Sequence, residues 1–178
     1  MIRDDVKKVL VTEEEIKQRC KEMGEAISRD YTDEDCLLVI GILKGSVPFM
    51  AELIKHISLN IEIDFMAASS YQGTESLGDI RILKDLDASL IDRKVLLVED
   101  IVDTGTTIKE LTRLMYNKGA GDVKVASLLD KPSRRQVDVE ADYTGFKIEN
   151  EFVIGFGLDY NQKYRNLPFI GVLKDELY

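Results

Sequence analysis

The stretch V-L-L-V-E-D-I-V-D-T-G-T-T, residues 95–107, determines how the rest of the chain is interpreted. Its first four residues form a short apolar run, which is typical of a strand buried on both faces of a parallel sheet. Glu99 and Asp100 follow at the expected carboxyl end of that strand, and apolar residues recur at helical spacing from Ile108 onward. The stretch therefore predicts a strand, a polar loop and a helix that begins near Thr106.

The polar loop has the composition of a phosphate-binding site. Ligands of open parallel sheets bind beyond the carboxyl ends of the strands, where the first N–H groups of the next helix face them. Small or hydroxyl-bearing residues let the backbone approach an anion closely. These residues are Thr104, Gly105, Thr106 and Thr107. Neighbouring carboxylates would repel a phosphate unless they bind a sugar diol or a hard cation, so a phosphorylated ribose with Mg2+ fits the whole stretch.

An ordinary strand-to-helix loop is the alternative interpretation of the same residues. In that case Thr and Asp cap the helix, while Glu99 and Asp100 are solvated. Two other nucleotide-binding signatures are excluded, because neither G-x-x-x-x-G-K-[ST] nor G-x-G-x-x-G occurs in this stretch.

Residues 95–107 resemble the phosphoribosyl-diphosphate binding motif of type I phosphoribosyltransferases, and the chain from Leu43 onward is similar to the bacterial hypoxanthine(-guanine) phosphoribosyltransferase family. The resemblance implies the type I phosphoribosyltransferase fold, an α/β domain whose central parallel sheet is flanked by helices. It also implies one domain over residues 1–178, with a small hood formed mainly by about 132–178 and part of the N-terminal chain. Some relatives carry a lysine where this chain has Thr106, which leaves more of the phosphate binding to backbone N–H groups.

Composition restricts the partners and the compartment. A formal charge of −9 argues against nucleic acid and anionic membrane surfaces, because both require clustered Lys and Arg. Cys20 and Cys36 lack C-x-x-C spacing, the first residues open directly into charge, and no apolar run approaches ~18–20 residues. We therefore expect a cytoplasmic protein without a disulfide or a membrane span.

A second strand, loop and helix unit is predicted around Lys44. Residues 37–42 form an apolar run, Leu43-Lys44-Gly45-Ser46 follows, and a helix is expected from Val47. Taken alone, Lys44 is typical of a solvated surface residue. By resemblance, Lys44, Gly45 and Arg165 bind the diphosphate, and the peptide bond between Leu43 and Lys44 is cis.

The remaining implied site residues belong to a lid and to the purine side. Ser70 and Tyr71, in a stretch expected to be mobile, match the family's closing lid. Lys131 matches the lysine that donates to the exocyclic oxygen of a 6-oxopurine, a role that suits a group able only to donate. Phe152 would ordinarily be interpreted as core, but by resemblance it stacks on the purine. The backbone of Val153 then binds the base edge. Arg134 and Arg135 are interpreted as part of a solvated connector.

The resemblance implies transfer of the 5-phosphoribosyl group from phosphoribosyl diphosphate to hypoxanthine or guanine, with Mg2+ as cofactor. The only histidine, His56, lies late in a predicted helix, so acid–base work is expected to fall to a carboxylate. Asp103, on the phosphate-binding loop, would be this catalytic residue and would accept the proton at N7 of the purine. Glu99 and Asp100 would bind the ribose hydroxyls and the cation, and Asp159 would lie near the base and a second Mg2+.

Two other functions remain open at this point. A ligand-sensing transcriptional regulator of the same fold would use the site as an effector pocket, although the acidic charge and the purine-side residues argue against it. A relative that prefers xanthine or adenine would share the same motif. The family also suggests a homo-oligomer, a dimer or a tetramer.

Overall fold

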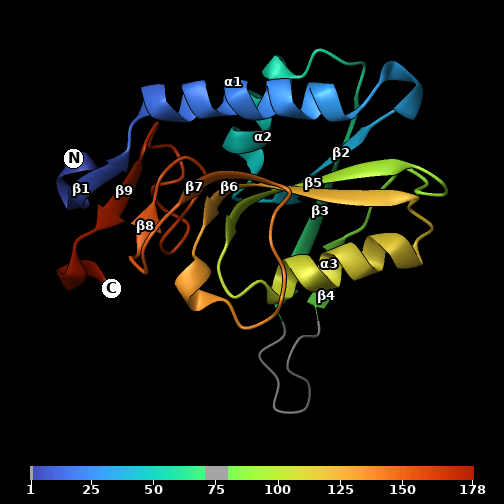
Figure 1. Ribbon diagram of the computed structural model, residues 1–178. Coiled ribbons are helices and arrows are strands. Elements are labelled where there is room, and N and C mark those ends of the chain that lie inside the picture. Colours follow the sequence, from blue (N-terminus) through green and yellow to red (C-terminus); the bar gives the residue numbers. More distant parts are fainter. Residues whose placement is uncertain (1, 71–79) are drawn as a thin grey trace.

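A six-stranded sheet forms the middle layer of the protein, with helices on both of its faces (Figure 1). The computed structural model describes residues 2–70 and 80–178. The strands are β1 Val6–Val11, β2 Leu38–Leu43, β3 Glu62–Ser70, β4 Ile80–Lys84, β5 Lys94–Val102, β6 Asp122–Asp130, β7 Tyr143–Lys147, β8 Val153–Ile154 and β9 Ile170–Leu173. The α-helices are α1 Glu13–Asp30, α2 Val47–Leu53 and α3 Thr106–Asn117. The short 3-10 helices are η1 Ile2–Asp5, η2 Asp33–Asp35, η3 Ile54–His56, η4 Pro132–Arg134 and η5 Asp175–Leu177.

The large sheet has the strand order β4-β3-β2-β5-β6-β7. Strands β3, β2, β5, β6 and β7 run parallel, and β4 pairs antiparallel with β3 at one edge. The chain leaves β2 for β3 on one side and leaves β5 for β6 on the other. The connections therefore diverge between β2 and β5, which is where ligands bind in sheets of this kind. The predicted central parallel sheet flanked by helices is confirmed.

Strand β5 is longer than its apolar run predicts. It continues to Val102, so Glu99 and Asp100 lie within the strand and not beyond its end. The sequence prediction of the strand end was wrong, because β6 continues to pair with β5 as far as Val102. Strand β2 stops pairing with β5 at Gly41 and Val98. The two carboxylates therefore follow the point at which β2 and β5 cease to pair.

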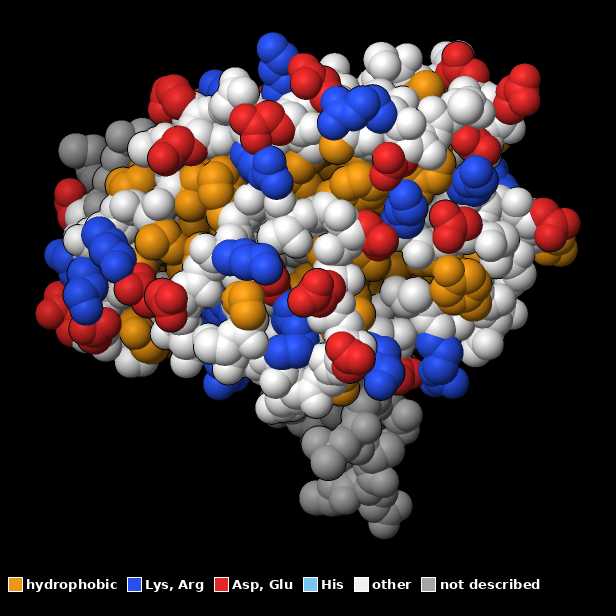
Figure 2. Space-filling model, in the orientation of Figure 1, with side chains coloured by type: hydrophobic (Ala, Val, Ile, Leu, Met, Phe, Trp, Pro, Cys, Tyr) orange, Lys and Arg blue, Asp and Glu red, His pale blue; other side chains and the backbone are white. Residues whose placement is uncertain are grey.

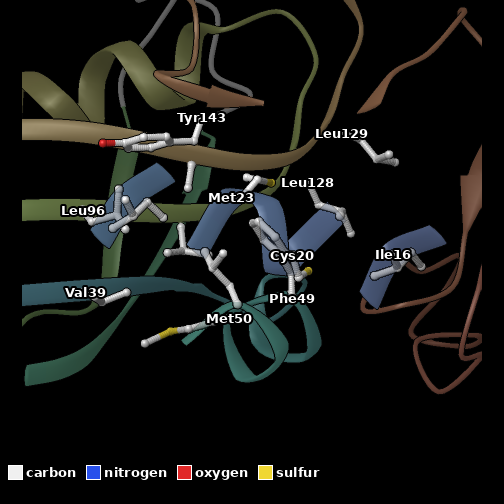
Figure 3. Close-up of a cluster of buried hydrophobic side chains, with 14 of the residues drawn as sticks. Ile16, Cys20, Met23, Val39, Phe49, Met50, Leu96, Leu128, Leu129 and Tyr143 are labelled. Carbon is white, nitrogen blue, oxygen red and sulfur yellow. The ribbon is translucent and has the colours of Figure 1, made fainter. Parts of the chain in front are cut away.

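Two hydrophobic clusters, one on each face, hold the helices to the large sheet. Figure 3 shows the first, in which Ile16, Cys20 and Met23 of α1 meet Phe49 of α2 and side chains from the strands. The second cluster contains Ile108, Leu111 and Met115 of α3. Helix α1 begins with a capping box, because the Thr12 side chain accepts from the N–H of Glu15 while the Glu15 carboxylate accepts from the N–H of Thr12.

A three-stranded sheet in the order β1-β9-β8 lies beside the large one (Figure 1). Strand β1 comes from the N-terminal part of the chain and pairs antiparallel with β9 from the C-terminal part. The range expected for the hood, about 132–178, also contains β7, which pairs with β6 in the large sheet. The small sheet is thus made by β1, β8 and β9 alone.

Charges of both signs are interspersed on the face of the molecule shown in Figure 2. Hydrophobic side chains are visible there mainly as narrow bands between the charged regions. In the ranges that the structure describes, none of the helices is both long enough and apolar enough to cross a bilayer.

Candidate active site

The ends of three neighbouring parallel strands bring the predicted site residues to one edge of the sheet. Lys44 follows β2, Asp103 follows β5 and Lys131 follows β6. Because these strands are parallel, their carboxyl ends open on the same side. The loop after β5 contains only residues 103–105 before α3 begins at Thr106, as the sequence predicts.

The conformation of this short loop depends on Gly105. Its φ is 85°, in the left-handed region that favours glycine. A Cβ atom at this position would lie 2.5 Å from Cγ1 of Val139, so there is no room for a side chain. The Thr106 N–H donates to Oγ1 of Thr104 at 3.4 Å. A small pocket at this point is lined by residues 101–105 with Glu99, Thr107 and Ile108.

Glu99 and Asp100 are half-buried acidic groups. Burial raises the pKa of Glu99 well above its usual range, and the neighbouring Asp100 charge adds to the effect. Burial also raises the pKa of Asp100 to about 6, partly offset by a hydrogen bond from the Ile101 N–H and by the charge of Arg165. Within residues 2–70 and 80–178, neither carboxylate has an ion-pair partner within 4 Å. Two such groups provide a strong local preference for a cation.

Gly45 lets the loop after β2 lie directly against Asp100. A Cβ atom at Gly45 would lie 1.5 Å from Oδ2 of Asp100, and one at Gly157 would lie 1.9 Å from the carbonyl oxygen of Gly45. The peptide bond between Leu43 and Lys44 is cis, as the resemblance implies. Backbone from β2, a side chain from β5 and the turn after β8 therefore meet closely at this point.

The basic residues of this region are paired with neighbouring side chains. Arg165 lies 2.7 Å from Oδ1 of Asp159 and donates to the carbonyl oxygen of Gly157 at 2.6 Å. Lys44 Nζ and Arg165 Nη2 each donate to Oε1 of Gln162 at 3.3 Å. An anionic ligand binding here would exchange these contacts for its own.

The expected metal ligands do not form one compact cluster. Among the described residues, no group of three or more His, Cys, Asp or Glu side chains lies close enough to hold a metal. Asp159 instead pairs with Arg165. Mg2+ usually takes one or two protein carboxylates and completes its shell with water and substrate oxygens, so Glu99 and Asp100 still fit such an ion.

Lys131 is buried, and its side chain is bound to the segment that precedes β8. Its ammonium donates to the carbonyl oxygen of Glu151 at 2.8 Å. Burial lowers the pKa of Lys131, and the negative charge of Asp103 partly offsets this. Lys131 therefore lies near both Asp103 and the segment that contains Phe152.

The ring of Phe152 is partly open to solvent and is held by two tyrosines. Phe152 is 36% exposed, which argues against the core interpretation. It stacks on Tyr178 with centroids 4.7 Å apart and meets the edge of Tyr160 at 5.5 Å. Val153, the next residue, is buried at the start of β8.

The interpretation as a solvated connector was wrong for Arg135, which is largely covered, whereas Arg134 is exposed but is bound to Asp103. Arg134 Nε donates to Oδ1 of Asp103 at 3.1 Å. Arg135 donates to the carbonyl oxygen of Asp103 at 2.5 Å and forms an ion pair with buried Asp130. Local sequence could not reveal these contacts, although both arginines follow a strand that ends at the edge where Asp103 lies.

The lid residues fall at the limit of the described chain. Ser70 is the last residue of β3, where its backbone pairs with Ile80 of β4. Tyr71 lies outside the described residues. Strand β3 extends to Ser70, because β4 pairs with it from Ala67 onward.

Comparisons with known proteins all point to one protein family. The family model for the phosphoribosyl transferase domain matches residues 8–161. A hypoxanthine-guanine phosphoribosyltransferase of Streptococcus agalactiae is 54% identical over 179 residues, covering 100% of this chain and 99% of the relative. The crystal structure of a hypoxanthine phosphoribosyltransferase from Staphylococcus aureus superposes with a TM-score of 0.95 at 50% identity, covering 99% of this chain and 96% of that one. A hypoxanthine phosphoribosyltransferase from Trypanosoma cruzi, in complex with the product IMP, has a TM-score of 0.92 at 38% identity and covers 98% of each chain.

Proposed function

Because the chain belongs to the phosphoribosyl transferase family, we propose that it transfers the 5-phosphoribosyl group of phosphoribosyl diphosphate to hypoxanthine and guanine. The products of this purine-salvage reaction are IMP or GMP and diphosphate. The observation that carries the proposal is the arrangement of three strand ends at one sheet edge, with two adjacent carboxylates, a short loop before α3 and a buried lysine.

The loop of residues 103–105 and the first turn of α3 would hold the 5′-phosphate. N–H groups at a helix start are not used within the helix and attract an anion. This chain has Thr106 where some relatives have a lysine, so backbone N–H groups and threonine hydroxyls carry the binding. The position of Gly105 against Val139 supports a loop whose shape is fixed before the ligand arrives.

The purine would lie between Phe152 and the end of β5. The exposed Phe152 ring offers a face for stacking, and Tyr178 and Tyr160 hold that ring in place. The ammonium of Lys131 has three donors and uses one on the carbonyl of Glu151, which leaves others for the exocyclic oxygen of a 6-oxopurine. Adenine carries an amino group at that position and would meet a second donor.

Asp103 would accept the proton from N7 of the base as N9 attacks the ribose. Its carboxylate is 42% exposed and lies on the loop that holds the phosphate, so it can reach a bound base. The hydrogen bond from Arg134 fixes one carboxylate oxygen and leaves the other available. In the reverse direction the same group would return the proton.

The other end of the site would hold the leaving diphosphate. Lys44 and Arg165 supply positive charge, and the forked guanidinium of Arg165 suits phosphate oxygens. Glu99 and Asp100 would bind the ribose hydroxyls and Mg2+, and Asp159 would lie near a second ion. Bound Mg2+ would neutralise charge that develops on the diphosphate. The chain's own residues would hold the base and the ribose in line, and this positioning would supply much of the rate enhancement.

A turnover assay with competing bases tests the proposal. The protein is incubated with phosphoribosyl diphosphate and Mg2+, and hypoxanthine, guanine, xanthine and adenine are offered together. We expect IMP and GMP to form and adenine to be excluded. Nucleotide formation from adenine or xanthine alone would assign a different base preference. Absence of any nucleotide, combined with nucleic-acid binding at low salt, would favour the regulator.

We also propose a compartment and an oligomeric state for the protein. Cys20 and Cys36 are both free thiols, which supports the cytoplasm as the compartment. We also propose a homo-oligomer, which sedimentation at enzyme concentrations used in the assay would test.

A further inference from the structure

Three successive carbonyl groups, those of the last residue of β5 and the first two residues of the loop after it, accept hydrogen bonds from residues 131–136. They are called the loop carbonyls below. The Lys131 N–H donates to the carbonyl oxygen of residue 102 at 2.9 Å, and the Gln136 N–H donates to that of residue 104 at 3.0 Å. Arg135 Nη1 donates to the carbonyls of residues 103 and 102, at 2.5 and 3.3 Å. All three carbonyls therefore point the same way, toward residues 131–136.

This arrangement decides where the N–H groups of the loop point. In a trans peptide the carbonyl and the following N–H point in opposite directions. The N–H groups of Asp103, Thr104 and Gly105 therefore point away from residues 131–136. Within residues 2–70 and 80–178, none of these three N–H groups has a recorded acceptor. They are free to bind an anion on the open side of the loop.

Arg135 is the only side chain among the donors, and it connects the loop to the sheet. One amino group of its guanidinium pairs with Asp130, the last residue of β6, while the other reaches the loop carbonyls. The side chains of Arg135 and Asp130 are 16% and 8% exposed. The stem of Arg135 also fills the space beside Gly105, because a Cβ atom there would lie 2.9 Å from its Cδ.

We propose that Arg135 is a positioning residue of the 5′-phosphate site. It does not touch the substrate but holds the loop carbonyls away from it, so that the N–H groups are presented to the phosphate. The inference rests on the proposed function for the identity of the anion. A lysine could pair with Asp130 but could not span both that carboxylate and the loop carbonyls, because its ammonium lacks the planar fork.

The test compares Arg135→Lys with Arg113→Lys, an arginine on α3 that is 68% exposed and pairs with Glu110. Calorimetry measures the binding of ribose 5-phosphate, which carries the phosphate without base or diphosphate, and separately of diphosphate with Mg2+. For Arg135→Lys we expect the Kd for ribose 5-phosphate to rise about tenfold or more, in line with the loss of charge-assisted hydrogen bonds. The Kd for diphosphate should stay within about twofold, and Arg113→Lys should match the wild type in both.

The split between the two ligands separates positioning from a general loss of structure. If ribose 5-phosphate binds folded Arg135→Lys as tightly as the wild type, or if both ligands weaken alike, the inference is overturned. If that variant does not fold, the double variant Asp130→Asn, Arg135→Gln removes both buried charges and takes its place with the same expected split. A wild type that binds ribose 5-phosphate but forms no nucleotide from any base would refute the proposed function and leave the result for Arg135 valid.

Discussion

The two ends of the proposed site are built from different groups. At the start of α3 the groups that face the ligand are backbone N–H donors, and their directions are set by carbonyls bound to residues 131–136. At the other end the groups are charged side chains, and Arg165 and Lys44 are already bound to Asp159 and Gln162. On the proposed assignment, the phosphate end would require no rearrangement, whereas the diphosphate end would exchange these partners for its ligand. The following changes test whether the two ends, and the base between them, depend on separate residues.

Asp103→Asn should have the largest effect, because it removes the proton acceptor and leaves the loop backbone in place. We expect kcat to fall ~10²–10⁴-fold, the usual contribution of a positioned general base. Binding of ribose 5-phosphate should be unchanged, since it depends on N–H groups. Steady-state kinetics and calorimetry measure the two quantities, with Asp87→Asn, at a side chain that is 90% exposed, as the control. Unchanged turnover in Asp103→Asn would remove this residue from the mechanism.

Gly45→Ala should damage the diphosphate end alone. The new Cβ would lie 1.5 Å from Oδ2 of Asp100, so the carboxylate or the loop must move. We expect the KM for phosphoribosyl diphosphate to rise about 10–100-fold, the range that corresponds to losing one or two charge-assisted contacts. The Kd for inorganic phosphate, which reaches the N–H groups of residues 103–107 without the ribose hydroxyls, should remain within about twofold. Equal weakening of both ligands would show that the two ends are not independent.

Phe152→Ala should affect the base without affecting either anionic end. Stacking of a base on an aromatic ring is worth about 1–3 kcal/mol, so the KM for hypoxanthine should rise about 5- to 150-fold. Tyr178→Leu leaves Phe152 in place but removes the ring that stacks on it at 4.7 Å, and should cost only about 2- to 5-fold. Initial-rate measurements at saturating phosphoribosyl diphosphate test both. If Tyr178→Leu had the larger effect, Phe152 would not be the ring that contacts the base.

The last change concerns stability, which should depend on pH because of a group at the diphosphate end. The pKa of Asp100 is raised from 3.8 to about 6 in the folded protein, so folding takes up a proton between these values. The free energy of unfolding should therefore fall as the pH rises from about 4 to about 6, by on the order of 1–3 kcal/mol relative to Asp100→Asn. Urea denaturation of both proteins across this range measures the difference. Parallel curves for the two proteins would mean that Asp100 has no raised pKa.

The sequence predicted the backbone features of the site better than its side-chain contacts. The helix start at Thr106 followed from local composition, because small residues before a helical pattern constrain the backbone directly. The cis peptide bond before Lys44 followed from the resemblance. Both features depend on residues that are neighbours in the chain, which is the information that a motif contains.

The contacts that the sequence did not predict join residues far apart in the chain. Arg134 and Arg135 resemble a charged surface turn, and only the tertiary fold brings them to Asp103, 31 and 32 residues earlier. The length of β5 was underestimated because Glu99 and Asp100 are poor strand residues in isolation, and pairing with β6 overrides that preference. The pairing of Asp159 with Arg165 likewise could not be read from either residue alone.

The most direct test of this account is a crystal structure with ribose 5-phosphate bound. The account predicts the phosphate oxygens within ~2.7–3.2 Å of the N–H groups in residues 103–107, with the loop carbonyls still bound to residues 131–136. A phosphate bound elsewhere, or a loop whose carbonyls have turned toward the ligand, would contradict it.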